Sequence, residues 1–98
     1  MAKNKSKEDL KKDQAEKKEN NHYIYIIECS DGSLYTGYTT DVERRVEEHN
    51  SGEGAKYTRG RGPVKLRHQE AFASRSLAQK REYQIKQLPR SQKEELLD

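Results

Sequence analysis

The stretch from residue 23 to residue 37, YIYIIECSDGSLYTG, constrains the fold more than any other part of the sequence. It contains two runs rich in Tyr, Ile and Thr, which favour β-strands, on either side of an Asp-Gly pair. Asp-Gly between two such runs is a strong signal for a tight antiparallel turn. We therefore expect a β-hairpin with strands over residues 23–28 and 33–38.

The loop of this hairpin decides which tyrosines share a face. A two-residue Asp-Gly turn would send Tyr25 and Tyr35 to opposite faces, because side chains alternate along a strand. A three-residue loop that also includes the preceding serine, with Gly32 in the left-handed conformation, would place both tyrosines on one face. In that register Tyr25 pairs with Gly37, which would leave an open pocket opposite the phenol.

Composition limits the size of the domain. The 98 residues are 38% charged and 30% hydrophobic, so little apolar material is available for a core and one small domain is expected. Residues 1–21 contain seven lysines and five acids but hardly any apolar side chain, which predicts a disordered charged tail. Residues 22–98 are expected to form the folded domain.

Some classes of protein and site are disfavoured by what the sequence contains. The one cysteine, Cys29, cannot form an internal disulfide, and we find neither a secretory signal pattern nor a long apolar run. We therefore expect a soluble, cytoplasmic protein without membrane contact. No CxxC or HxxxH spacing occurs, which argues against a structural zinc site.

The placement of charge is more informative than the net charge, which is only +3. Residues 54–69, GAKYTRGRGPVKLRHQ, contain five basic residues and no acid, with Tyr57 and His68 between them. Basic side chains interleaved with aromatic ones are typical of a nucleic-acid-binding segment. A solvated loop leading into a strand with outward-facing basic residues explains the pattern equally well. The basic residues are Lys56, Arg59, Arg61, Lys65 and Arg67.

Residues 39–52, TTDVERRVEEHNSG, predict a short helix with Thr40 and Glu43 as its capping box. Its apolar stripe consists of two valines, and on a helical period Arg45 and His49 fall on the same face. Either these two side chains belong to a site, or Arg45 packs its stem along the valines while His49 caps the end of the helix.

The rest of the chain predicts one strand and two helices. Apolar and polar residues alternate over 64–72, which indicates a third strand. The stretch SRSLAQKREYQIKQL predicts a helix with Ser74 as N-cap and a buried stripe that begins at Leu77, and a short last helix follows, opened by Ser91. Glu82 lies at the edge of the stripe, where a carboxylate ordinarily pairs with a neighbouring cation.

Four motifs in this order resemble the GIY-YIG nuclease domain. They are YIY at 23–25, YTG at 35–37, DVERRVEEH at 41–49 and REYQIK at 81–86. The resemblance extends from residue 22 to about residue 96. It is nearest to short stand-alone bacterial members of the superfamily that are catalogued as uncharacterised, the UPF0213-like branch, in which YTRGRGPVKL is also familiar.

The sequence differs from the family pattern at three points. Tyr23 stands where the first motif has Gly, and Thr36 stands where the second has Ile. Many nucleases of the superfamily also carry an Asn well after the metal-binding Glu, whereas this chain has none beyond Asn50. Catalysis would then do without that Asn or be weakened, or Gln84, Lys86 or Gln87 would take its place.

The resemblance implies an α+β fold, in which a three-stranded antiparallel sheet is flanked by helices in the order β-β-α-β-α-α. It implies a metal-dependent endonuclease that hydrolyses phosphodiester bonds in nucleic acid. The sequence does not decide between DNA and RNA; we favour DNA as the substrate and a monomer as the oligomeric state. The alternative is a nucleic-acid-binding module that cleaves poorly and is recruited by a protein partner supplying substrate affinity.

The resemblance also assigns roles to particular residues. The tyrosines at 25 and 35 would line the active site, one of them positioning or deprotonating the attacking water, and the arginine would neutralise the scissile phosphate. The predicted catalytic residues are Tyr25, Tyr35, Arg45 and His49, and Glu82 would hold Mg²⁺ or Mn²⁺. From the charge pattern we expect Lys56, Tyr57, Arg59, Arg61 and Lys65 to bind nucleic acid, and from the turn signals we expect Gly32 and Gly37 to shape the hairpin.

Overall fold

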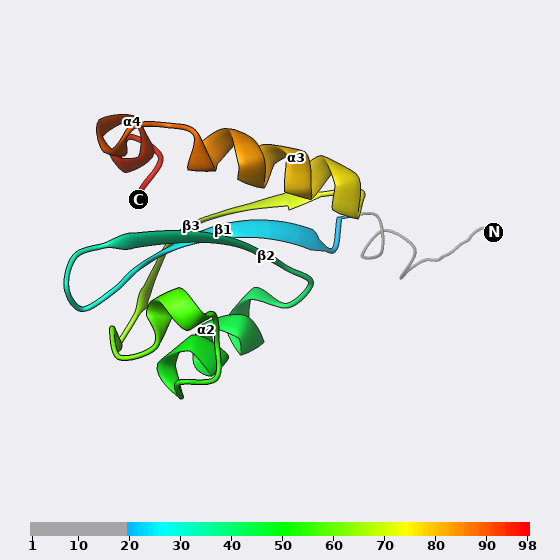
Figure 1. The fold of residues 1–98 in the computed structure, drawn as a ribbon. Helices are drawn as coiled ribbons and strands as arrows, with labels where there is room; N and C mark the ends of the chain where they lie inside the picture. The colour runs from blue at the N-terminus through cyan, green and yellow to red at the C-terminus, as the bar shows by residue number, and fades with distance from the viewer. Residues whose placement is uncertain (1–19) are drawn as a thin grey trace.

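The computed structural model describes residues 20–98 and contains the predicted α+β domain (Figure 1). Its antiparallel sheet has the strand order β2-β1-β3, with β1 at His22–Glu28, β2 at Leu34–Thr39 and β3 at Lys65–Phe72. The predicted fold class and order of elements are confirmed. Residues 1–19 of the predicted tail lie outside the described residues.

Helices cover both faces of the sheet (Figure 1). Helix α2 (Val42–Asn50) and the 3-10 helix η1 (Lys56–Thr58) lie on one face, and α3 (Arg75–Lys86) and α4 (Arg90–Glu94) lie on the other. None of the helices within residues 20–98 is long and apolar enough to cross a lipid bilayer.

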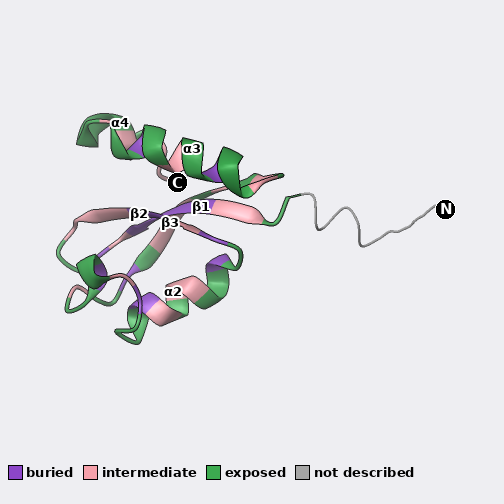
Figure 2. Cartoon of the chain, turned by 45° about the vertical axis from the view of Figure 1, so that its right-hand side comes forward, coloured by how far each residue is buried: buried purple, intermediate pink, exposed green. Residues whose placement is uncertain are grey.

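The central strand β1 supplies the cores of both layers. Ile24 and Ile26 are fully buried against α3, whereas Tyr25 and Ile27 are buried on the α2 side. Figure 2 shows buried positions along this strand. Because successive side chains point to opposite faces, one strand of apolar residues serves two layers, and a chain with few apolar residues can still fold.

The hairpin has a three-residue loop and not the two-residue Asp-Gly turn. Residues 30–32 form the loop, and Gly32 has a φ of +86°, in the left-handed region that favours glycine. Tyr25 pairs with Gly37 in the ladder between β1 and β2. Tyr25 and Tyr35 therefore lie on the same face of the sheet, toward α2.

The expectation of an open pocket opposite Tyr25 is wrong. The phenol ring itself lies over Gly37, and a Cβ added to that glycine would be 2.5 Å from Oη of Tyr25. Gly37 is required because it lets the ring of the facing strand lie close to the backbone of β2.

The N-cap of α2 is Asp41, one residue later than predicted. The carboxylate of Asp41 accepts a hydrogen bond from the backbone N–H of Arg44 at 3.1 Å. Thr40 does not cap the helix; instead Oγ1 of Thr39 accepts from the N–H of Asp41 at 3.1 Å. A carboxylate at this position also interacts favourably with the positive end of the helix dipole.

The two C-terminal helices follow the prediction in part. Ser74 caps α3 as expected, because its hydroxyl accepts from the N–H of Leu77 at 3.2 Å. Leu77 itself is 50% exposed, so its predicted burial is wrong, and α3 buries a narrower stripe that contains Ala78 and Ile85. Helix α4 has no side-chain cap, so the predicted capping box at Ser91 does not form.

Candidate active site

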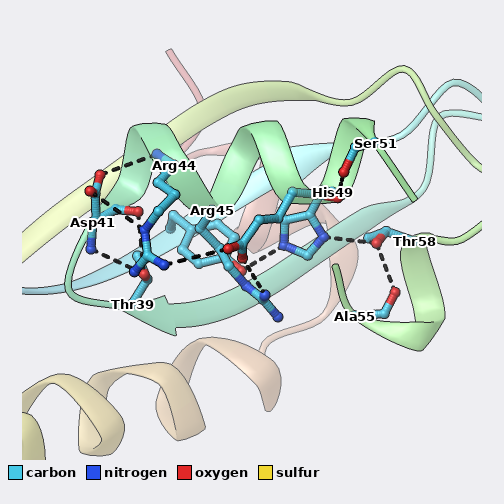
Figure 3. A network of polar contacts seen from close by, with 10 residues as sticks. Thr39, Asp41, Arg44, Arg45, His49, Ser51, Ala55 and Thr58 are labelled. Carbon is cyan, nitrogen blue, oxygen red and sulfur yellow. Dashed lines mark hydrogen bonds and ion pairs between the residues drawn. The ribbon is translucent and has the colours of Figure 1, made fainter. Parts of the chain in front are cut away.

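His49 is a deeply buried polar side chain on the α2 side, with 2% of its surface exposed. Its Nε2 lies 2.8 Å from Oη of Tyr25, and its Nδ1 lies 2.8 Å from Oγ1 of Thr58 (Figure 3). Both ring nitrogens are thus bonded inside the domain. The alternative in which His49 caps the end of the helix is wrong.

The hydrogen bonds of Thr58 determine which atoms donate and which accept between Thr58, His49 and Tyr25. Oγ1 of Thr58 donates to the carbonyl of Ala55 at 2.9 Å, so it accepts from Nδ1–H of His49. Burial, and next the charge of Arg45, lower the pKa of His49, which keeps the ring neutral. We therefore assign Nε2 as the acceptor of a hydrogen bond from the hydroxyl of Tyr25.

Tyr25 is a neutral phenol in this environment. It is 1% exposed, and burial raises its pKa to about 12 even though the neighbouring Arg45 acts in the opposite direction. A phenol with this pKa is not ionised at neutral pH. It can accept a proton from water only if its own proton leaves at the same time, and His49 is the base in contact with it.

Arg45 lies about one turn before His49 and on the same face of α2. Its Nη1 donates to Oε1 of Glu48 at 2.8 Å, and 30% of its side chain is exposed. Figure 3 shows the Arg45 side chain extending from α2 past β2. The same guanidinium also lies close enough to Tyr25 to affect the pKa of the phenol, and a phosphate matches the planar geometry of its remaining donors.

Tyr35 connects these residues to the basic segment 54–69. Its ring centroid lies 6.4 Å from that of Tyr25 and 5.5 Å from that of His49, which it meets edge-on. Tyr35 also stacks against Tyr57, with 5.8 Å between the ring centroids and 21° between the ring planes. The guanidinium of Arg61 lies over the ring of Tyr57, 4.5 Å from the centroid. Tyr57 and Arg61 therefore border the cluster that Tyr25, Tyr35, Arg45 and His49 form.

The remaining predicted nucleic-acid contacts lie outside this column of rings. Lys56, Arg59 and Lys65 are exposed, and within residues 20–98 their side chains make no hydrogen bond or ion pair with the cluster. Arg67 of the same segment has a structural role, because it pairs with Glu28 and donates to the backbone carbonyl of Asp98 at 3.0 Å.

Glu82 lies on α3, across the sheet from the helix that carries His49. Its side chain is 19% exposed, and its Oε2 lies 3.0 Å from Nζ of Lys86, the cation that pairs with it. Its charge is close enough to contribute to the raised pKa of Tyr25, behind burial and the nearer charges. No hydrogen bond joins Glu82 to Tyr25, Arg45 or His49 among the described residues.

The donor set limits which metal this region could hold. Residues 20–98 contain no group of three or more His, Cys, Asp or Glu placed to bind an ion, so a metal at Glu82 would have one protein carboxylate. Mg²⁺ and Mn²⁺ fit such a site, because Mg²⁺ and similar hard ions keep several water ligands and bind substrate phosphate. Of the residues considered in place of the distal Asn, Lys86 contacts Glu82, whereas Gln84 and Gln87 are exposed.

The sequence did not identify three residues that build the cluster. Thr58 is 1% exposed and holds His49, but in the sequence it is one threonine among basic residues. Gly54 lies against His49, where an added Cβ would be 2.8 Å from the histidine Cα. Asn50 accepts a hydrogen bond from the N–H of Val64 at 2.6 Å and so fixes the far end of the segment. Contacts of such isolated neutral residues give no sequence pattern by which to recognise them.

Relatives with the same domain are found by comparison with known proteins. Residues 21–95 match the model of the GIY-YIG catalytic domain. A UPF0213 protein of Halobacterium salinarum is 71% identical over 75 residues, which are 76% of this chain and 97% of that protein. A UPF0213 protein of Halalkalibacterium halodurans is 60% identical over 77 residues, which are 79% of this chain and 82% of that protein.

Two solved structures are similar in both sequence and fold. The solution NMR structure of a UPF0213 protein from Bacillus halodurans is 60% identical, with a TM-score of 0.51 over 76% of this chain and 80% of that chain. The solution NMR structure of a protein from E. faecalis is 55% identical, with a TM-score of 0.53 over 76% and 79% of the two chains. The chain thus belongs to the GIY-YIG catalytic domain family and, by its relatives, to the UPF0213 branch.

Proposed function

We propose that the protein is an endonuclease that hydrolyses phosphodiester bonds in nucleic acid, DNA in preference to RNA, with a divalent metal ion. The observation that supports this most directly is the chain of hydrogen bonds from Tyr25 through His49 to Thr58, beside the guanidinium of Arg45. It combines a neutral base, a phenol that can pass on a proton and a cation for phosphate.

In the proposed reaction a water molecule attacks the phosphorus and gives a proton to Oη of Tyr25. Tyr25 at the same time gives its own proton to Nε2 of His49, 2.8 Å away. The imidazolium that forms keeps its Nδ1–H bond to Thr58. The bond from phosphorus to the leaving oxygen breaks, and that oxygen takes a proton from solvent.

Arg45 binds a non-bridging oxygen of the phosphate and stabilises the negative charge that develops there. Its position is held by Glu48, which accepts from Nη1 of Arg45 at 2.8 Å. Glu82 would hold Mg²⁺ or Mn²⁺, which when bound supplies further stabilisation of charge on the phosphate oxygens.

The test is cleavage of labelled single-stranded, duplex and flapped DNA, and of the matching RNA, with Mg²⁺ or Mn²⁺ present. Glu82→Gln keeps the shape of the side chain but removes the charged ligand, so cleavage should fall by orders of magnitude while the melting temperature hardly changes. Glu94→Gln is the matched control, because it also breaks an i,i+4 ion pair, with Arg90 at 2.8 Å on α4. If Glu82→Gln cleaves as well as wild type, the metal site must lie elsewhere.

Two observations favour a second function, that of a binding module recruited by a partner protein. The hydroxyl of Tyr25 is buried, and the carboxylate of Glu82 is already paired with Lys86. Both would have to become accessible to substrate or metal before cleavage. A wild-type protein that binds nucleic acid but cleaves no member of the substrate panel supports this module.

A further inference from the structure

In the basic segment, Arg61 differs from the exposed cations Lys56, Arg59 and Lys65. Nη1 of Arg61 lies 2.5 Å from Oδ2 of Asp31, and the backbone carbonyl of Arg61 accepts from the N–H of Ser30 at 2.7 Å. Both contacts tie the residue to the hairpin loop. Arg61 is therefore ordered before any ligand arrives, and its charge is already matched by a carboxylate.

An arginine in this situation suits stacking better than phosphate binding. Its guanidinium is planar and lies over Tyr57, 4.5 Å from the ring centroid, with 39% of the side chain exposed. A phosphate would have to compete with Asp31 for the charge, whereas a nucleobase needs only the flat surface. Nucleobases commonly stack on arginine planes and on tyrosine rings.

The exposure of Tyr57 supports the same conclusion. Its ring is 43% exposed although it is large and aromatic, and it stacks on Tyr35 at 5.8 Å. Tyr35 in turn meets His49 at 5.5 Å. The column that starts with Arg61 at the surface thus ends at the histidine of the proposed active site.

We propose that Tyr57 and Arg61 form a platform on which an unpaired nucleobase stacks, beside the phosphate that Arg45 binds. In a duplex both faces of a base are covered by its neighbours, so the substrate is single-stranded at this nucleotide. The placement beside the cleaved bond rests on the proposed nuclease function; the stacking of a base does not.

The test compares binding of two oligomers that carry the same phosphates, oligothymidylate and an abasic deoxyribose chain of equal length, in EDTA. Arg61→Lys keeps the charge but loses the plane, so it should bind oligothymidylate about 10-fold more weakly than wild type and the abasic chain equally well. Its dependence on salt should be unchanged. Lys56→Ala is the contrasting control, and should weaken both oligomers by the same factor.

A second variant guards against a folding defect at Arg61. Tyr57→Leu keeps an apolar contact with Tyr35 but removes the ring, and should show the same loss on oligothymidylate alone, whereas Tyr57→Phe should bind as wild type does. Equal losses on both oligomers, or no loss in either Arg61→Lys or Tyr57→Leu, would overturn the platform.

Cleavage by wild type under the conditions given above separates this proposal from the proposed function. A protein that cleaves but shows no base-dependent loss refutes the platform alone. A protein that shows the base-dependent loss but cleaves nothing refutes the nuclease and retains the platform.

Discussion

The hydroxyl of Tyr25 lies 2.8 Å from Nε2 of His49, although the two residues are 24 positions apart in the sequence. One comes from the central strand and the other from the last turn of α2. The contact forms because Gly37 has no side chain and the phenol can lie across β2. The same bond packs the domain and, in our proposal, moves the proton of the reaction.

We expect the domain to lose stability as the pH falls from about 6.5 toward about 5. Burial lowers the pKa of His49 in the fold, while the unfolded chain takes up a proton near the ordinary value of about 6.5. Below that pH the unfolded state binds more protons, so the free energy of unfolding should decrease, by at most about 1.4 kcal/mol per pH unit. Above it this contribution is fully present. Urea unfolding across this range measures it.

His49→Gln provides the control for this pH dependence. It should be less stable than wild type at neutral pH, with a flatter profile between about pH 5 and 6.5, because the group that titrates there is gone. Cleavage by wild type should fall at the lower pH at which His49 is protonated in the folded domain, since protonated His49 cannot accept from Tyr25. A wild-type free energy of unfolding that stays constant in this range would refute the assignment of a neutral His49.

Thr58→Val should destabilise the domain by about 1–3 kcal/mol, because it leaves the buried Nδ1–H of His49 without an acceptor. Thr58→Ser keeps the hydroxyl and should restore most of this loss. The valine variant should also lower kcat with little change in KM, since the imidazole is no longer held with Nε2 as acceptor. Chemical unfolding and steady-state cleavage of the three proteins provide the measurement; equal stability of the valine and wild-type proteins would argue against the assigned bond.

Gly54→Ala should destabilise the domain by about 1–3 kcal/mol, as overpacking of a tight site does. The added methyl would meet the ring of His49 and lie 2.8 Å from its Cα, an approach that the backbone must shift to relieve. Gly62→Ala is a matched control in the same segment, because its Cβ would have 3.9 Å to the nearest atom, on Asn50. A melting temperature of Gly54→Ala equal to that of Gly62→Ala would contradict the close contact.

Nucleic-acid binding should weaken steeply with salt. Roughly four phosphate contacts give a log-log slope of about 3 to 4 in magnitude. The double substitution Lys56→Ala with Arg59→Ala should reduce the slope by about 2, whereas Lys80→Ala with Lys93→Ala, on α3 and α4, should leave it unchanged. Titrations at several salt concentrations decide this, and an unaltered slope in the first pair would remove the segment from the interface.

The hairpin could be predicted because its signals are local. Asp-Gly between two runs of strand-forming residues indicated the turn, and of the two loops that the sequence allowed, the three-residue loop with a left-handed Gly32 gives the observed pairing of Tyr25 with Gly37. Alternation then placed Tyr35 on the face of Tyr25. In the same way, the helical period placed Arg45 on the face of α2 that carries His49.

The contacts that depend on the path of a loop could not be predicted. Whether Thr58 reaches His49 depends on how the chain turns between α2 and β3, and no periodicity describes that turn. Thr40 and Asp41 are adjacent and both suit an N-cap, so the sequence alone could not decide between them. The exposure of Leu77 depends on how α3 lies on the sheet, which is a property of the whole packed domain.

The position of β1 makes folding and function inseparable in this domain. Its even-numbered isoleucines fill the layer under α3, and its odd-numbered Tyr25 belongs to the cluster under α2. A chain in which this strand is unpaired lacks both core layers and does not hold the phenol of Tyr25 against His49. We therefore expect no hydrolysis from partly folded molecules. In our proposal, a domain built in this way cleaves no nucleic acid while it is being synthesised, and it stops cleaving again whenever the domain opens.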